Sequence, residues 1–305
     1  MRASIDIGSN STLLLVADYR DNIFEVVSDQ SRITSLGREL DKNGVFHPES
    51  MRLLKEALVE YSEELKKYGI SPGDCICTAT EASRVAQNAL SFFQDIKKEL
   101  GLKIQTINAE GEAYYTMKGI TAGADLDAGT IVVMDIGGAS TELIKVDVLK
   151  SEILETVSLP VGAVRATEWK EVGAFEKEMS NIYKGYDLSP FSAETMICVA
   201  GTMVSFAAML LDLTDFDSDR ISSFSTSLKE FNSFFDFQAE MGPEDLLKRF
   251  PVLGKRAETI LGGGLVAKSI LDQCGVLRVQ FSTRGLRYGA LSEGKIDERF
   301  TFRGR

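Results

Sequence analysis

The sequence IDIGSNSTLLLVAD at residues 5–18 returns, at a constant offset, as MDIGGASTELIKVD at residues 134–147. An apolar run precedes each copy, and a β-rich segment follows it, at residues 24–28 and 153–159. Each copy therefore predicts a strand, a tight turn rich in Gly and Ser, and two further strands. Self-similarity of this kind indicates a chain built from two related halves.

Helices and further strands are expected after each copy. Residues 48–68 carry apolar side chains at helical spacing, and Gly69 follows as a helix terminator. Other helices are expected at residues 81–100, 110–120, 203–213, 226–241, 243–250 and 265–275, and short strands at 74–78, 103–108, 195–199 and 276–281. The alternation predicts an α/β protein of two domains, residues 1–124 and 125–305, divided near residues 122–128. Two facing repeats would leave a cleft lined by both turns.

The composition is that of a globular protein with an acidic surface. Apolar residues make up 44% of the chain, and the formal net charge is −11. That charge argues against broad binding to nucleic acids or membranes, and a phosphate-chain partner would need a local positive field from arginines, backbone N–H groups and metal ions. No apolar stretch is long enough to span a bilayer, and the N-terminus has no signal-peptide pattern, so we expect a cytoplasmic protein.

The few histidine and cysteine residues limit the chemistry further. His47 is the one histidine of the sequence, which excludes a Ser-His-Asp triad, a Cys-His pair and a His-rich metal site. The cysteines lack a second pair at metal-ligand spacing, so we expect buried, reduced thiols. These cysteines are Cys75, Cys77, Cys198 and Cys274.

The repeated turns have the composition of a phosphate-binding site. Turns of Gly, Ser and Asn direct backbone N–H groups outward and add hydroxyl or amide donors. Asp6 and Asp135 precede the turns and would repel a bare phosphate, whereas Mg²⁺ between carboxylate and phosphate would bridge the two. Glu142 takes the place that Leu13 has in the first copy, either as a metal-ligating or water-orienting carboxylate or as an exposed edge residue.

The two turns resemble the phosphate loops of the exopolyphosphatase/guanosine pentaphosphate phosphatase (Ppx/GppA) family, a branch of the actin–hexokinase–Hsp70 superfamily. The resemblance continues at residues 79–88 (ATEASRVAQN), 108–113 (NAEGEA), 200–202 (AGT), 256–264 and 282–289 (STRGLRYG). It implies two ribonuclease-H-like domains of the actin/hexokinase type and the short, two-domain form of the family. It also implies a metal-dependent phosphohydrolase that releases terminal orthophosphate from polyphosphate, with guanosine pentaphosphate (pppGpp) as a second candidate substrate.

The resemblance implies roles for individual residues. Glu112 would be the general base that activates water, and Arg84 would hold phosphate oxygens. Asp6, Asp135 and Glu142 would hold Mg²⁺ or Mn²⁺, and the last two would also position the water. The residues implied to bind substrate phosphate come from three loops: Gly8, Ser9, Asn10, Ser11, Gly137, Gly138, Ala139, Ser140, Gly201 and Thr202. The implied partner is polyphosphate or a guanosine polyphosphate, with no nucleic acid or membrane, and a homodimer is left open.

Departures from the family pattern keep other functions open. Ala139 and Ala200 stand where the family has glycine, and Gly111 stands where it has the first Glu of a pair. One alternative is a catalytically weak or inactive member that binds polyphosphate or a guanosine polyphosphate as a regulator. A small-molecule kinase is another; it would place residues 262–264 (GGG) near a nucleotide, although a turn between helices explains them equally well. The basic tail, residues 299–305, would line the cleft rim or be solvated.

Overall fold

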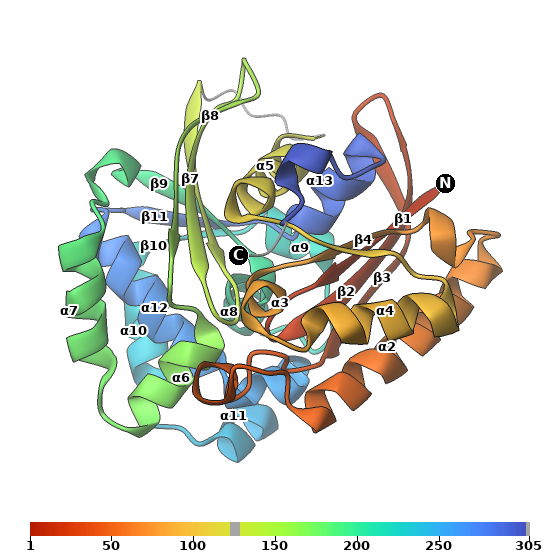
Figure 1. Cartoon of the computed structure of the whole chain (residues 1–305). Helices are drawn as coiled ribbons and strands as arrows, with labels where there is room; N and C mark the ends of the chain where they lie inside the picture. Colours follow the sequence, from red (N-terminus) through yellow and green to blue (C-terminus); the bar gives the residue numbers. More distant parts are fainter. Residues whose placement is uncertain (123–128, 303–305) are drawn as a thin grey trace. The chain divides into compact units, whose positions relative to one another are not determined.

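The computed structural model describes residues 1–122 and 129–302, which form two compact units (Figure 1). The first unit contains residues 1–122 and 284–302, and the second contains residues 129–283. This division differs from the predicted one, because residues 284–302 pack with the first unit rather than the second. Residues 123–128 of the predicted boundary, and residues 303–305 of the basic tail, lie outside the described residues.

A mixed sheet forms the centre of the first unit. Its strands, in the described residues, are β1 (Arg2–Ile7), β2 (Ser11–Arg20), β3 (Ile23–Ile33), β4 (Ile76–Ala79) and β5 (Ile104–Thr106), in the order β3-β2-β1-β4-β5. β1 pairs antiparallel with β2 and parallel with β4. Consecutive residues are buried in β1 (residues 3–5) and in β2 (residues 14–17), as expected of strands that are covered on both faces.

Helices cover both faces of this sheet (Figure 1). α2 (Pro48–Lys67) and α4 (Ala89–Leu100) pack against the face that carries Ile5. α5 (Ala109–Thr121) and α13 (Leu286–Glu293) pack against each other, and α13 lies on the opposite face, where the Ser4 hydroxyl donates to the Arg287 carbonyl at 2.8 Å. Side chains alternate along β1, so Asp6 shares the face of Ser4. The short helices of this unit are α1 (Leu40–Asn43) and α3 (Glu81–Val85).

The second unit repeats this plan with a larger sheet. Its described strands are β6 (Thr130–Ile136), β7 (Thr141–Asp147), β8 (Glu152–Leu159), β9 (Thr195–Val199), β10 (Ser225–Ser227) and β11 (Arg278–Phe281), in the order β10-β11-β9-β6-β7-β8. Its helices are α6 (Ala163–Glu171), α7 (Phe175–Gly185), α8 (Ala200–Leu210), α9 (Ser218–Ser222), α10 (Leu228–Gln238), α11 (Pro243–Arg249) and α12 (Ile260–Gln273). One apolar core joins Met134 of β6 to Phe206 of α8, Phe235 of α10 and Ile270 of α12.

The two copies of the sequence repeat have the same strand pairing. In each unit the first strand pairs antiparallel with the second and the second with the third, and the first also pairs parallel with a later strand. The pairing of β2 with β3 shifts register after Val16, and the pairing of β7 with β8 shifts after Lys145, which is the equivalent position of the repeat. The prediction of two similar domains with mixed sheets and flanking helices is therefore confirmed.

The helix expected at residues 81–100 is interrupted, and this part of the prediction is wrong. α3 ends at Val85 and α4 begins at Ala89. Between them, the Asn88 carboxamide accepts a hydrogen bond from the N–H of Phe46 at 2.8 Å, and the N–H of Gln87 donates to the Gly44 carbonyl at 2.9 Å. These long-range bonds take the main chain out of the helix, although helical spacing continues in the sequence.

The glycine triplet at residues 262–264 lies inside α12, so the turn that was expected there is wrong. All three glycines are buried in close helix contacts. A Cβ atom on Gly262 would lie 2.6 Å from the main-chain nitrogen of Thr167 in α6, and one on Gly264 would lie 2.3 Å from the Phe235 ring in α10. The triplet therefore serves helix packing.

The cysteines, the histidine and the length of the apolar helices, which the composition brought to attention, can now be placed in the structure. The cysteines named above are free and buried. His47 precedes α2, and its ring nitrogen Nδ1 accepts a hydrogen bond from the N–H of Glu49 at 3.2 Å, which caps that helix. In the part of the chain that the structure describes, no helix has the length and apolar character needed to cross a membrane.

Candidate active site

The first turn of the repeat joins β1 to β2. The N–H of Gly8 donates to the Ser11 carbonyl at 2.9 Å and closes the turn. The carbonyls of Ser9 and Asn10 accept hydrogen bonds of 2.7 to 2.9 Å from N–H groups of residues 34–37. Because these carbonyl oxygens are engaged within the protein, the turn can offer N–H groups to an anion, as the sequence predicts.

The loop that supports this turn is strained. Ser35 and Glu39 both have φ of 51°, in the left-handed region that residues with a Cβ seldom adopt. Backbone strain of this kind is concentrated at functional sites. The sequence gives no sign of it, because neither position has the Gly or Asn that usually marks a left-handed residue.

Asp6 is the next-to-last residue of β1, just before the first turn, on the sheet face that meets α13. Its carboxylate oxygen Oδ1 is buried and has no hydrogen-bond partner in the described structure. Burial raises the pKa of Asp6 to about 6, although the Arg287 charge and the Thr78 hydroxyl oppose the shift. A buried oxygen without a partner is unfavourable, and a bound hard cation would satisfy it. Asp6 therefore fits the predicted role of metal ligand.

Arg84 and Glu112, the residues implied to hold phosphate and to act as base, form an ion pair. Arg84 lies on α3, and Glu112 lies in the first turn of α5. Nη1 of Arg84 donates to Oε1 of Glu112 and, at 2.8 Å, to the carbonyl of Ile107. The two side chains are only 10% and 9% exposed. Burial alone would lower the pKa of Arg84, but the neighbouring charges of Glu112 and Glu81 raise it.

The second turn joins β6 to β7 and is built like the first. The N–H of Gly137 donates to the Ser140 carbonyl at 2.9 Å. N–H groups at the start of α6, from residues 163–164, donate to the carbonyls of Gly137 and the next residue. Nη1 of Arg165, also on α6, donates to the Ala139 carbonyl at 2.7 Å. The sequence gives no signal for Arg165, because no helix is predicted at the position of α6.

Asp135 and Glu142 face each other directly on the paired strands β6 and β7. Glu142 is 4% exposed, and the Ser158 hydroxyl of β8 donates to it at 2.7 Å. The alternative of an exposed edge residue is therefore wrong, because β7 lies between two other strands. Carboxylates directly opposite each other on a sheet repel. A divalent cation would offset that repulsion, so this pair also fits the predicted metal site.

The third loop follows β9, and Ala200 in it has φ of 64°, which is a glycine-like conformation. A Cβ atom on Gly201 would lie 1.7 Å from Nη1 of Arg256, so a guanidinium rests against the main chain of the loop. Thr202 is 8% exposed and lies in the first turn of α8. A side chain at position 201 would therefore displace the Arg256 guanidinium, and Ala200 beside it is in a strained conformation.

The predicted site residues fall into two groups. The first unit contains Asp6, the turn at residues 8–11, Arg84 and Glu112; the second contains Asp135, Glu142, the turn at 137–140, Gly201 and Thr202. Within the described residues of either unit, no three Asp, Glu, His or Cys side chains gather as a metal site. Each unit therefore supplies only part of the predicted set of metal ligands.

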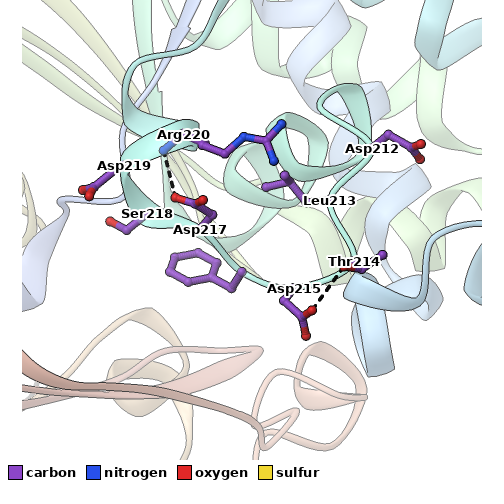
Figure 2. Close-up of a pocket in the computed structure, with 9 residues that line it drawn as sticks. Asp212, Leu213, Thr214, Asp215, Asp217, Ser218, Asp219 and Arg220 are labelled. Atoms are coloured by element: carbon purple, nitrogen blue, oxygen red, sulfur yellow. Dashed lines mark hydrogen bonds between the residues drawn. The ribbon is translucent and has the colours of Figure 1, made fainter.

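A hollow of about 500 Å³ lies elsewhere in the second unit and is lined by the loop Asp212–Arg220 (Figure 2). The loop offers mainly carboxylates, and two of these already accept local bonds: Asp217 from the N–H of Arg220 at 3.0 Å, and Asp215 from the Thr214 hydroxyl at 3.1 Å. An acidic lining disfavours a phosphate ligand. None of the predicted site residues is among those that line this hollow.

The fold and the two turns define a class: a protein of two repeated α/β units, each with a Gly/Ser-rich turn that follows an aspartate-bearing strand. Within that class, a family model described as the Ppx/GppA phosphatase family matches residues 15–295, and the chain belongs to this family.

Similar proteins agree with this membership. The chain is 30% identical to a "Bifunctional 3-dehydroquinate synthase/phosphatase" of Fusobacterium nucleatum over 96% of its own length, but spans only 46% of that protein. It is 25% identical to "Exopolyphosphatase 2" of Mycobacterium tuberculosis over 94% of this chain and 96% of that one. The crystal structure of the Ppx/GppA phosphatase of Aquifex aeolicus (type II variant) matches with a TM-score of 0.72 and 28% identity, over 96% of this chain and 99% of that one.

Proposed function

We propose that the protein is a phosphohydrolase that releases terminal orthophosphate from inorganic polyphosphate, with the 5′-phosphate of pppGpp as a second substrate. The observation that carries the proposal is the buried Arg84–Glu112 pair in a member of a phosphatase family. A buried carboxylate held by a guanidinium is fixed in place, as a general base must be. The similar exopolyphosphatase, which this chain matches over nearly its whole length, supports the choice of substrate.

The proposed reaction uses groups of this chain for binding and proton transfer. The N–H groups and hydroxyls of the Gly/Ser turns would bind phosphate oxygens, and Arg84 would add a charged contact. A carboxylate oxygen of Glu112 would take a proton from the attacking water. Phosphoryl transfer depends mainly on such positioning and on charge stabilisation, so no covalent intermediate is needed.

A divalent cation, Mg²⁺ or Mn²⁺, belongs to the same proposal. Asp6 in the first unit and the Asp135–Glu142 pair in the second are the candidate ligands, and Oδ1 of Asp6 is the buried oxygen without a hydrogen-bond partner in the described structure that supports this choice. When bound, such a cation neutralises phosphate charge and polarises the phosphoryl oxygen. A cytoplasmic location is also part of the proposal, because free, buried cysteines suit a reducing compartment.

The regulator alternative depends on the departures from the family pattern, and one departure has a packing explanation. A Cβ atom at Gly111 would lie 2.8 Å from Cβ of Phe300, so the C-terminal segment occupies the space of the missing glutamate side chain. Glu112 next to it keeps its contact with Arg84. Gly111 therefore gives no support to a loss of activity.

A comparison of substrates tests the proposal and shows which phosphate compound the enzyme prefers. Orthophosphate release would be measured with purified protein and Mg²⁺ on long-chain polyphosphate, on pppGpp and on ATP. We expect release from polyphosphate and from pppGpp, and much slower release from ATP. No release from any of the three by folded protein would exclude the phosphohydrolase and favour the regulator.

A further inference from the structure

Glu81 is a charged neighbour of Arg84 at a position that the family pattern does not specify. It lies on α3, one turn before Arg84. Its Oε2 accepts hydrogen bonds from Nε of Arg84 at 3.1 Å and from Nη2 at 2.5 Å. Glu81 therefore occupies the Nε/Nη2 edge of the guanidinium, which is an edge that binds carboxylates and phosphates with two parallel hydrogen bonds.

The contacts of Arg84 differ between its two edges. Nη1 donates hydrogen bonds to Glu112 and to the Ile107 carbonyl. The Glu81 side chain is 26% exposed, whereas the Glu112 side chain is 9% exposed. Solvent therefore reaches Arg84 from the Glu81 side, and a phosphate that arrives from solvent meets the edge that Glu81 occupies.

We propose that Glu81 is a specificity-determining residue that competes with the terminal phosphate of the substrate for Arg84. The inference rests on the proposed function, in which Arg84 contacts phosphate. A doubly charged terminal phosphate displaces Glu81 from the Nε/Nη2 edge, while Nη1 stays on Glu112. When orthophosphate leaves, Glu81 returns to Arg84 and lowers the affinity for the product.

The exchange follows from charge and exposure. Glu81 carries one negative charge, and its pair with Arg84 is partly open to water, where ion pairs are weak. A terminal phosphate carries up to two charges and presents three oxygens to the guanidinium, so it forms the stronger contact. Glu81 thus favours ligands with a fully charged terminal phosphate over singly charged phosphodiesters.

Binding of inorganic orthophosphate to Glu81→Gln tests this proposal. Orthophosphate is the product, so calorimetric titration with Mg²⁺ present requires no turnover. We expect its Kd to fall about threefold to tenfold, because the variant loses one partly exposed competing ion pair. KM for polyphosphate should fall in parallel, and kcat should not rise, because product leaves more slowly. Glu81→Ala provides a second variant, and thermal unfolding shows that each is folded.

Two controls separate competition at Arg84 from a general charge effect. Glu110→Gln removes the same charge from the exposed first turn of α5, and it should leave the Kd for orthophosphate unchanged. In an Arg84→Gln background, Glu81→Gln should have no further effect, since competition requires the guanidinium.

The outcomes distinguish this proposal from the proposed function. An unchanged or weaker affinity in folded Glu81→Gln, or equal tightening in Glu110→Gln, overturns the competition. Suppose that Glu81→Gln binds orthophosphate more tightly in a way that depends on Arg84, but that the protein releases no phosphate from any substrate. This result supports the competition at Arg84 and overturns only the proposed hydrolysis. Orthophosphate binding by none of the variants overturns both.

Discussion

Asp6 and Ala200 are both held in unfavourable local states at the candidate phosphate-binding loops. Oδ1 of Asp6 is buried with no partner in the described structure, and Ala200 has a left-handed backbone. Each state lowers the stability of the folded chain relative to a better-suited residue. Sites that bind charged ligands often contain such residues, because a ligand can provide the missing contact. Both therefore give predictions for the stability of variants, and Asp6 also gives one for activity.

Asp6→Asn should stabilise the protein without metal at pH 8, by about 1 kcal/mol, because it removes a buried charge. The raised pKa of Asp6, about 6, makes this effect depend on pH. Because the pKa of Asp6 in the folded protein lies above the ordinary value of 3.8, protonation of Asp6 stabilises the fold at pH values below about 3.8. This stabilisation is lost as the pH rises through about 6. The stabilisation by Asn should therefore disappear near pH 4, as thermal unfolding at both pH values would show.

The same substitution should lower Mg²⁺-dependent phosphate release about tenfold or more, as expected for loss of a group that holds or orients a metal. Mg²⁺ should raise the melting temperature of wild type more than that of Asp6→Asn. A variant that is less stable than wild type at pH 8 would show that Asp6 has a structural partner and would contradict this reading.

Ala200→Gly should stabilise the second unit by about 1 kcal/mol, because an alanine Cβ is unfavourable at positive φ. Denaturant unfolding measures the change. Ala208→Gly, in the same helix α8, is the matched control and should destabilise by about 1 kcal/mol, as glycine does inside helices. A loss of stability in both variants would mean that Ala200 is not strained.

At this scale the sequence suggests candidate residues, but it does not predict their contacts. Asp6, Asp135 and Glu112 could be chosen from the repeat and from the family resemblance. The ion pair of Arg84 with Glu112 joins residues from two helices, and no spacing rule connects them. Glu81 was missed for the same reason, because an acidic residue at the start of a helix is common and shows nothing of its partner.

At the scale of elements, glycines set how closely α5 and α13 approach. A Cβ atom on Gly289 of α13 would lie 1.8 Å from the Tyr115 carbonyl of α5, and one on Gly119 of α5 would lie 2.2 Å from the Gly285 carbonyl. Both contacts are with main-chain atoms, which cannot rotate away. Since α5 carries Glu112, this crossing also fixes the candidate base relative to the sheet.

Gly289→Ala should therefore destabilise the first unit by about 1–3 kcal/mol and reduce phosphate release, because the helices must separate. Gly185→Ala is the matched control: Gly185 ends α7, is exposed and has nothing within 4 Å of the added Cβ. That control should leave stability within about 0.5 kcal/mol of wild type. Equal melting temperatures for Gly289→Ala and wild type would contradict the close crossing.

Elements were predictable where local pattern and tertiary structure agree. The helix at residues 48–68 and the strand at 195–199 have strong periodicity, and both are present as α2 and β9. The break at residues 86–88 depends on bonds to residues 44–46, which no local pattern reveals. Residues 262–264 suggest a turn by composition, but tight packing against α6 and α10 requires glycine within a helix.

At the scale of the whole molecule, both ends of the chain build the first unit. Nη2 of Arg287 pairs with Asp29 of β3 at 2.8 Å, and Tyr288 packs in a cluster with Leu15 and Ala17 of β2. The N–H of Phe302 donates to the Thr106 carbonyl at 2.8 Å beside β5. The repeat predicts two units, but it does not show that the last segment returns to the first unit. Such contacts between distant residues leave no periodic signal.

The central claim is that the chain hydrolyses terminal phosphate with Glu112 as base. The most direct measurement compares orthophosphate release from polyphosphate, with Mg²⁺, by wild type, Glu112→Gln and the exposed control Glu110→Gln. We expect Glu112→Gln to lower kcat about 10²- to 10⁴-fold with its fold and its KM unchanged, and Glu110→Gln to match wild type. Full activity in folded Glu112→Gln would show that Glu112 is not the base.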